Sequence, residues 1–316
     1  MSAPSATDLA ARKRRARHVS SGWARRLWLR YEALRGLALL SPALVFMLVM
    51  VTASLATLAV VSFWSDDAIG APHVYTLANY RTLLGREGDI YRALLLRSIA
   101  MAGLTTVAVI AFAYPMAYLM AFHVKKHKAL WLILITIPFW INYLLRVASW
   151  KVILGHNGVI NSLLLGIGAI DQPIDALLYN KGAVILALTH AWAAFAILPI
   201  YVSLEKIDRS LLEAATDLGD GPMRRFVRVT LPLSMPGVLG AAMLVFVRTA
   251  GDYVTPSLFG GSSGTMIGAL IVSLFTEQDN GPLASAVSVV MMLTLAACVC
   301  AFAFVLDARR RLRARA

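Results

Sequence analysis

Residues 210–237 read SLLEAATDLGDGPMRRFVRVTLPLSMPG, a polar, helix-forming stretch that lies between long apolar segments. From Glu205 to Arg228 the chain carries five acidic and five basic side chains. Charged groups at this density are too costly to place in the hydrocarbon of a bilayer. The stretch must therefore protrude into water, where another protein can bind it.

The rest of the chain has the composition of a membrane protein. Of its 316 residues 59% are hydrophobic and 15% are charged, whereas soluble domains average roughly 45–50% and 25%. A helix of about 20 apolar residues crosses a bilayer. The chain contains six charge-free runs that are long enough, and they predict an all-α polytopic protein with six transmembrane helices. The charge-free runs that predict them are 36–65, 98–124, 129–145, 182–204, 229–247 and 280–306.

Two further apolar runs are interrupted by glycines and are not predicted to span. The run 152–170 is expected to be an external loop with short helices, and 253–276 is expected to be helical only at its ends, with a flexible break at 260–264. The two cysteines, Cys298 and Cys300, lie inside an apolar run without metal-ligand spacing and are interpreted as reduced packing residues.

Lysine and arginine are distributed unevenly between the segments that connect the runs. One side of the membrane receives 22 of the 30, including nine before the first run, and the other side receives six. Because these residues gather on the cytoplasmic side, we expect both termini and the loop 205–235 to be cytoplasmic. The predicted organisation is a basic tail at 1–35, a six-span domain at 36–306 and a second basic tail at 307–316. The first tail abuts a span, which favours membrane lipid over nucleic acid as its partner.

The cytoplasmic loop is predicted to contain two short helices. Ser210 and Glu213 have the spacing of a capping box, which predicts a helix that starts at Leu211. Gly219 stands where a C-terminal cap is expected, and Pro222 suits the first position of the second helix. Prolines at 232 and 236 are expected to end that helix ahead of the fifth span.

This loop resembles the EAA motif of binding-protein-dependent ABC transporter permeases. In that family the helix that carries the motif docks into a groove on a cytoplasmic ATPase subunit. Small alanines allow close approach, and a rigid capped helix can pass ATPase closure to the spans. The residues that match, and that the resemblance assigns to ATPase coupling, are Glu213, Ala214, Ala215, Gly219, Leu231 and Pro232.

The chain itself has no Gly-x-x-x-x-Gly-Lys-Ser/Thr phosphate loop. The resemblance therefore implies a permease subunit that is not an enzyme and holds no cofactor or metal, with ATP and Mg bound by a separate ATPase. It also implies an ATPase dimer, a second homologous permease and a periplasmic substrate-binding protein as partners. The implied location is a bacterial cell inner (plasma) membrane.

Two more stretches resemble spermidine/putrescine permeases within this family. They are 137–161, which begins IPFWINYLLRVASW, and 251–261, which reads GDYVTPSLFGG. Together with the loop, the resemblance covers most of residues 36–306. It implies an importer of polyamines that works by alternating access.

A path for polyamines needs carboxylates for charge and aromatic faces for cation–π contact. Asp252 is the acidic residue near a span interior, and Arg248 precedes it at i, i+4 spacing, where the two could pair on one helix face. Three interpretations follow: a self-neutralising structural pair, a cation path through Asp252, or an anion or zwitterion path through Arg248. The residues predicted to line the path are Asp252, Tyr253, Arg248, Trp140, Tyr143 and Trp192.

Two other classes compete with the importer. A stand-alone secondary transporter would use buried titratable residues as an ion relay, but the predicted spans hold one acidic residue and almost no histidine. A membrane enzyme would need a convergent set of catalytic or metal-binding side chains, and no Ser/His/Asp pattern occurs at the predicted span ends.

Overall fold

The structure is a computed structural model that describes residues 32–65 and 74–315. In this part of the chain Trp64 and Tyr75 form an antiparallel β-bridge, and all other regular elements are helical. Nearly all of the predicted tail at 1–35 lies outside the described residues. The chain divides into two compact units, one ending at Val60 and one beginning at Val61.

The first unit consists, in its described part, of the helix α2 (Glu32–Val61) up to residue 60. The 23 residues of Leu39–Val61 are apolar enough and long enough to cross a membrane. Pro42 lies within the helix, as transmembrane helices tolerate. The first predicted span is therefore confirmed as a helix.

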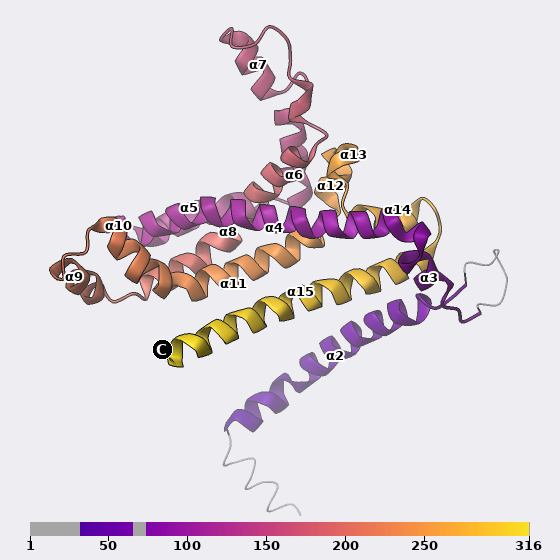
Figure 1. The fold of residues 1–316 in the computed structure, drawn as a ribbon, viewed down its shortest axis with the longest axis horizontal. Coiled ribbons are helices and arrows are strands. Elements are labelled where there is room, and N and C mark those ends of the chain that lie inside the picture. The colour runs from indigo at the N-terminus through magenta and orange to yellow at the C-terminus, as the bar shows by residue number, and fades with distance from the viewer. Residues whose placement is uncertain (1–31, 66–73, 316) are drawn as a thin grey trace, which may run out of the picture. The chain divides into compact units, whose positions relative to one another are not determined.

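The second unit contains the remaining elements, which Figure 1 traces from purple to yellow. They are α3 (Ala78–Leu84), η1 (Arg86–Gly88), α4 (Asp89–Tyr118), the π-helical η2 (Leu119–His123), α5 (Lys128–Thr136), η3 (Ile137–Trp140), α6 (Tyr143–Leu154), α7 (Val159–Gly166), η4 (Asp175–Leu177), α8 (Lys181–Glu205), α9 (Arg209–Asp217), α10 (Pro222–Arg225), the π-helical η5 (Phe226–Thr230), α11 (Leu231–Ala250), α12 (Val254–Phe259), α13 (Gly261–Gly264), α14 (Ile267–Thr276) and α15 (Gly281–Arg315).

The third predicted span, 129–145, is not one straight helix. The segments Lys128–Trp140 and Tyr143–Gly166 meet at an angle of 83°, so the described chain has five straight spans, or six if this bent pair counts as one. Asn142 explains the break, because its side chain accepts a hydrogen bond from the Leu144 backbone N–H at 2.9 Å and starts a new helix. Figure 1 shows α6 and α7 leading away from α4, α8 and α11.

The core of this unit is built by α4, α8 and α11. Helix α8 is buried on most of its faces, and Ala187, Ala191 and Ala196 are almost fully buried within it. Small residues let membrane helices approach closely. At Gly237 of α11 an added Cβ would lie 2.5 Å from the Pro199 carbonyl oxygen, so the two backbones meet there.

A smaller apolar cluster joins α3, the start of α4, α14 and α15. The hydroxyl of Ser98 accepts a hydrogen bond from the Ile267 N–H at 2.8 Å and so holds the start of α14 against α4. The flexible break predicted at 260–264 is wrong, because Gly261–Gly264 forms the helical turn α13. Gly261 has φ +58, and an added Cβ would lie 2.3 Å from the Tyr179 carbonyl oxygen, so this glycine serves close packing.

Two other sequence predictions concern the run 152–170 and the C-terminal tail. The run 152–170 contains the end of α6 and the short helix α7, so the predicted short helices are confirmed, whereas its external location stays a prediction. The predicted C-terminal tail at 307–316 begins as a continuation of α15, whose helical backbone extends to Arg315.

Candidate functional site

The first part of the site is the loop that carries α9. Its N-terminal cap is Asp208, whose Oδ1 accepts a hydrogen bond from the Ser210 N–H at 3.0 Å. The predicted capping box at Ser210 and Glu213 is wrong, because the extended backbone of Asp208 lets the helix begin at Arg209. The hydrogen bonds from the Ser210 backbone and side chain lower the pKa of the Asp208 carboxyl.

The C-terminal end of α9 confirms the prediction for Gly219, which has φ +86. The Gly219 N–H donates to the Thr216 carbonyl at 2.9 Å, and the Asp220 N–H donates to the Ala215 carbonyl at 3.0 Å. This pair of bonds is a Schellman motif, which requires a left-handed residue at its centre. Helix α9 therefore has a side-chain cap at its N-terminus and a backbone cap at its C-terminus.

The second helix of the loop begins at Pro222, as predicted, but it does not end at Pro232 or Pro236. Helices α10, η5 and α11 form one continuous span of 29 residues, Pro222–Ala250. The π-helical turn closes with the Leu231 N–H on the Phe226 carbonyl. This wider turn directly precedes Pro232 and accommodates the proline within a continuing helix.

Two arginine side chains connect the two helices of the loop. Arg225 Nη1 donates to Thr216 Oγ1 at 2.9 Å, and Arg228 Nη1 pairs with Asp220 Oδ1 at 3.2 Å. Both contacts join the second helix to the end of α9. The two helices of the loop are therefore fixed to one another.

The loop is also attached to α4 through Phe226. Its ring packs edge-on against Tyr114, with ring centroids 5.7 Å apart, and against Tyr118, at 5.9 Å. The hydroxyl of Tyr114 forms a hydrogen bond with Ser234 Oγ at 2.9 Å. A displacement of the loop must therefore act on both α4 and α11.

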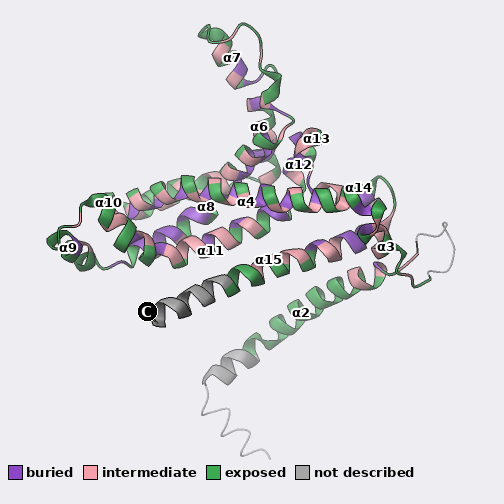
Figure 2. Cartoon of the chain, in the orientation of Figure 1, coloured by how far each residue is buried: buried purple, intermediate pink, exposed green. Residues whose placement is uncertain are grey.

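The surface of the loop is largely exposed, as Figure 2 shows over α9 and α10. Two large apolar side chains that were not assigned to coupling are strongly exposed, Leu218 at 88% and Met223 at 73%. An apolar residue beside a helix-capping glycine in a charged loop is the signal that could have indicated Leu218. Of the predicted coupling residues, Glu213, Ala214, Gly219 and Pro232 are exposed, Leu231 is half-buried and Ala215 is buried.

The second part of the site lies where two interrupted helices meet. One interruption is the bend before α6, and the other follows α11 at Gly251. The Tyr143 hydroxyl donates to Asp252 Oδ2 at 2.7 Å and contacts Thr255 Oγ1 at 2.8 Å. The Val254 N–H donates to Asp252 Oδ1 at 3.1 Å. Non-helical backbone at membrane depth occurs where it is buried in protein or lines a polar cavity.

Aromatic rings lie beside this carboxylate. Trp192 of α8 stacks on Tyr143 with centroids 5.3 Å apart and an interplanar angle of 20°. Phe195, which sequence reasoning missed, packs edge-on against Trp192 at 5.7 Å. The Arg248 guanidinium lies over both rings, 5.1 Å from Trp192 and 4.8 Å from Phe195.

The predicted pairing of Arg248 with Asp252 is not formed. Helix α11 ends at Ala250, so the i, i+4 geometry does not reach Asp252. In the described part of the chain Arg248 makes no ion pair or hydrogen bond, and Asp252 is engaged by Tyr143 and Val254. The self-neutralising interpretation is therefore wrong.

The structure brings together four of the six predicted path residues, which are Tyr143, Trp192, Arg248 and Asp252. Trp140 and Tyr253 border the two interruptions but are exposed, at 88% and 48%. Neither makes a ring contact with the cluster among the described residues. Over the same residues, no group of three His, Cys, Asp or Glu side chains is arranged to hold a metal ion.

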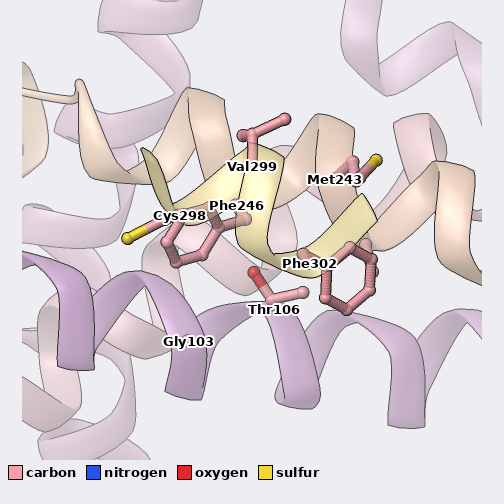
Figure 3. A pocket seen from close by; sticks show the side chains of 8 residues that line it. Gly103, Thr106, Met243, Phe246, Cys298, Val299 and Phe302 are labelled. Atoms are coloured by element: carbon pink, nitrogen blue, oxygen red, sulfur yellow. The ribbon is translucent and has the colours of Figure 1, made fainter. Parts of the chain in front are cut away.

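A separate pocket of about 180 Å³ lies between α4, α11 and α15. Figure 3 shows its lining, which includes Thr106, Phe246 and Phe302. The lining is almost wholly apolar and includes none of the predicted path residues. It is therefore not the polar path that the sequence predicted.

The family follows from comparison with known proteins. The family model described as "Binding-protein-dependent transport system inner membrane component" matches residues 113–312, which include both parts of the site. This chain belongs to that family. It is a permease subunit of an ABC importer and an inner-membrane component.

Curated relatives of the permease agree. It is 36% identical over 230 residues to the spermidine/putrescine transport system permease protein PotB of Escherichia coli (strain K12), covering 73% of this chain and 82% of PotB. The match to PotB of Salmonella typhimurium has the same identity and covers 79% of that protein. The inner membrane ABC transporter permease protein YdcU of E. coli is 32% identical over 276 residues, covering 82% of this chain and 86% of YdcU.

Solved structures confirm the fold of the permease. A chain of a bacterial ABC transporter that imports the acidic polysaccharide alginate matches with a TM-score of 0.68 at 16% identity, covering 90% of this permease and 99% of that chain. A chain of the MetNI methionine ABC transporter matches with a TM-score of 0.54 at 16% identity, covering 71% and 99%. The predicted all-α, polytopic importer-permease fold is confirmed.

Proposed function

We propose that this permease forms part of the translocation path of an ATP-driven importer whose cargo is a polyamine of the spermidine/putrescine kind. The observation that carries the cargo assignment is the buried carboxylate of Asp252 beside Tyr143 and Trp192, at the meeting point of two interrupted helices. The names of the PotB relatives support the same cargo.

The chemistry of the cluster suits an alkyl chain that carries ammonium groups. Asp252 supplies a carboxylate that can accept a charge-assisted hydrogen bond from an ammonium. The stacked rings of Tyr143 and Trp192 supply faces for cation–π contact and for methylenes. When an ammonium replaces the Tyr143 hydroxyl at Oδ2, the carboxylate keeps a donor throughout. Alternating access would expose this position to each side of the membrane in turn.

Helix α9 is proposed as the coupling helix that docks on an ABC ATPase dimer, which holds ATP and Mg. Caps at both ends keep it rigid, and the packing of Phe226 against α4 transmits its movement. The exposed side chains of Leu218 and Met223 provide apolar surface for docking. The other proposed partners are a second homologous permease and a periplasmic substrate-binding protein, with both termini of this chain cytoplasmic.

Uptake by the complete importer tests the role of Asp252. In proteoliposomes that contain the ATPase, both permeases and the binding protein, Asp252→Asn should abolish uptake of radiolabelled putrescine and spermidine. Asp171→Asn, which alters an exposed carboxylate in the loop after α7, is the matched control and should transport normally. Normal uptake by the Asp252 variant would remove this residue from the path.

A second candidate cargo is an anionic or zwitterionic solute, which Arg248 favours. Its guanidinium is held on two aromatic faces and has no acceptor in the described part of the chain. Calorimetric titration of the cognate binding protein separates the two candidates. Binding of spermidine or putrescine supports the first, and binding of a carboxylate-bearing solute alone supports the second.

A further inference from the structure

Arg146 is buried beside the bend in the third span. It lies in the first half of α6, is 9% exposed and donates to three backbone carbonyls, one in α8 and two in the segment just before α6. Its Nη1 reaches the Ala191 oxygen of α8 at 3.2 Å, and its Nη2 reaches the oxygens of Phe139 at 3.1 Å and Ile141 at 2.8 Å. Arginines near span ends often extend outward to water, but this side chain points into the protein instead.

The accepting carbonyls explain why an arginine stands here. Those of Phe139 and Ile141 lie where η3 ends and the chain turns, so they have no helical N–H partner. A backbone carbonyl without a hydrogen-bond partner is costly in the membrane interior, where no water can replace the partner. The planar guanidinium fork can reach carbonyls in two directions at once, which a lysine ammonium on a flexible stem does poorly. The Phe139 ring also lies 4.8 Å from the guanidinium carbon.

The contacts make Arg146 a connector between the bend and the core. One hydrogen bond holds α8 and two hold the last residues before α6, so the guanidinium fixes the angle between these segments. Tyr143 begins α6 one turn before Arg146. Fixing that turn also fixes the direction in which the Tyr143 hydroxyl meets Asp252.

We propose that Arg146 is a positioning residue that sets the bend of the third span and thereby aims Tyr143 at Asp252. Arg146 forms no ion pair in the described part of the chain, so carbonyl dipoles and one ring hold its charge. The consequence for transport rests on the proposed role of Asp252, whereas the consequence for the bend does not.

The bend can be measured on the full-length permease in lipid nanodiscs. In a Cys298→Ser, Cys300→Ser background, spin labels are placed at the exposed positions Leu130 on α5 and Val152 on α6. Pulsed electron resonance then gives the distance distribution between labels. Arg146→Gln and Arg146→Lys should shift or broaden this distribution. Arg97→Gln should leave it unchanged, because Arg97 donates to a single carbonyl, that of Ser262, away from the bend.

The possible results distinguish the effect of Arg146 on the bend from its effect on transport. An unchanged distribution in both Arg146 variants overturns it, and if Arg146→Gln is not produced as folded protein, Arg146→Lys decides because it keeps the charge. A changed bend together with normal polyamine uptake supports the role of Arg146 in setting the bend and contradicts the step from the bend through Tyr143 to transport, while uptake by Asp252→Asn tests the role of Asp252 separately. A changed bend with lost uptake, while Asp252→Asn also loses uptake, supports both.

Discussion

The hydroxyl of Tyr143 donates a hydrogen bond to Oδ2 of Asp252 at 2.7 Å, although 109 positions separate the two residues in the sequence. The contact joins the start of α6 to the segment that follows α11, so it closes the gap between two interrupted helices. With the Val254 N–H on the other oxygen, both carboxylate oxygens of Asp252 have a donor. These two hydrogen bonds offset the cost of burying the Asp252 carboxylate in a membrane protein.

Removing the Tyr143 hydroxyl should destabilise the permease. Tyr143→Phe leaves the ring on Trp192 but takes one donor from a buried carboxylate, which costs about 1–3 kcal/mol. The melting temperature of the purified protein should therefore fall. Tyr253→Phe, which alters an exposed ring beside the same interruption, should melt like the parent protein. In a double-mutant cycle with Asp252→Asn the two costs should be non-additive; additive costs would contradict the contact.

Replacing Arg248 should affect the two candidate cargoes in opposite directions. Arg248→Gln frees the faces of Trp192 and Phe195 and removes a positive charge that repels a cation. For a polyamine the apparent KM should fall about fivefold, the equivalent of roughly 1 kcal/mol of cation–π contact. For a carboxylate-bearing cargo the same variant should lose uptake. Arg97→Gln is the control arginine, and an unchanged KM for every cargo would place Arg248 outside the path.

A side chain at Gly219 should loosen the coupling helix. Its φ of +86 costs an L-residue about 1–2 kcal/mol, and an added Cβ would meet no atom within 4 Å, so the cost lies in the backbone alone. Gly219→Ala should reduce cargo-stimulated ATP hydrolysis and uptake in parallel in the assembled importer. Gly221→Ala is the matched control, because Gly221 has φ −66 and equally open space. Equal activity of the two variants would argue against the capped end as a coupling element.

Gly237 should be intolerant of even a methyl group. An added Cβ would lie 2.4 Å from the Ser203 Cβ and 2.5 Å from the Pro199 oxygen, so α8 and α11 would have to separate. Overpacking of this kind costs about 1–3 kcal/mol, which should appear as a lower melting temperature. Gly240→Ala, on the same helix with open space, should not melt earlier.

The order of α9 should depend on pH through its N-terminal cap. The Ser210 donors lower the pKa of Asp208 in the folded loop. The contribution of this cap to the stability of α9 is therefore fully present at pH values above the pKa of an aspartate in the unfolded chain. It is lost as pH falls through the lower pKa that Asp208 has in the folded loop. A spin label at position 218 should become more mobile in acid. In the Asp208→Asn variant the side chain still caps α9 but does not titrate. The mobility of the label at position 218 should therefore change less with pH in this variant. Identical pH profiles for the two proteins would contradict the role of Asp208 as a titrating cap.

The sequence predicts the straight spans well because their signal is local. An apolar run of sufficient length must be helical in a bilayer, since each backbone group needs a partner. The Gly219 and Pro222 predictions succeed for a similar reason, because left-handed backbone and a fixed φ are properties of single residues. The predicted helix ends at Pro232 and Pro236 fail because a π-helical turn ahead of them carries the helix on, which no residue type announces.

The candidate path is only partly readable from sequence. Tyr143, Trp192 and Asp252 were predicted from their chemistry, and the structure brings them together. The position of Arg248 was misjudged because i, i+4 pairing assumes a helix that here ends two residues too early. Arg146 was missed because its partners are backbone carbonyls, which carry no residue-specific signal, and because the bend that frees them is itself a tertiary feature.

The backbone contact at Gly237 has a mechanical consequence for the continuous span Pro222–Ala250. Helices that already touch at one point can rock about it but cannot be pressed closer there. About 20 Å of helix extends from Gly237 toward each end at 1.5 Å per residue. The crossing at Gly237 is therefore a pivot near the middle of this helix. When the Pro222 end of the helix is displaced, its other end, beside Asp252, is displaced by a similar distance in the opposite direction.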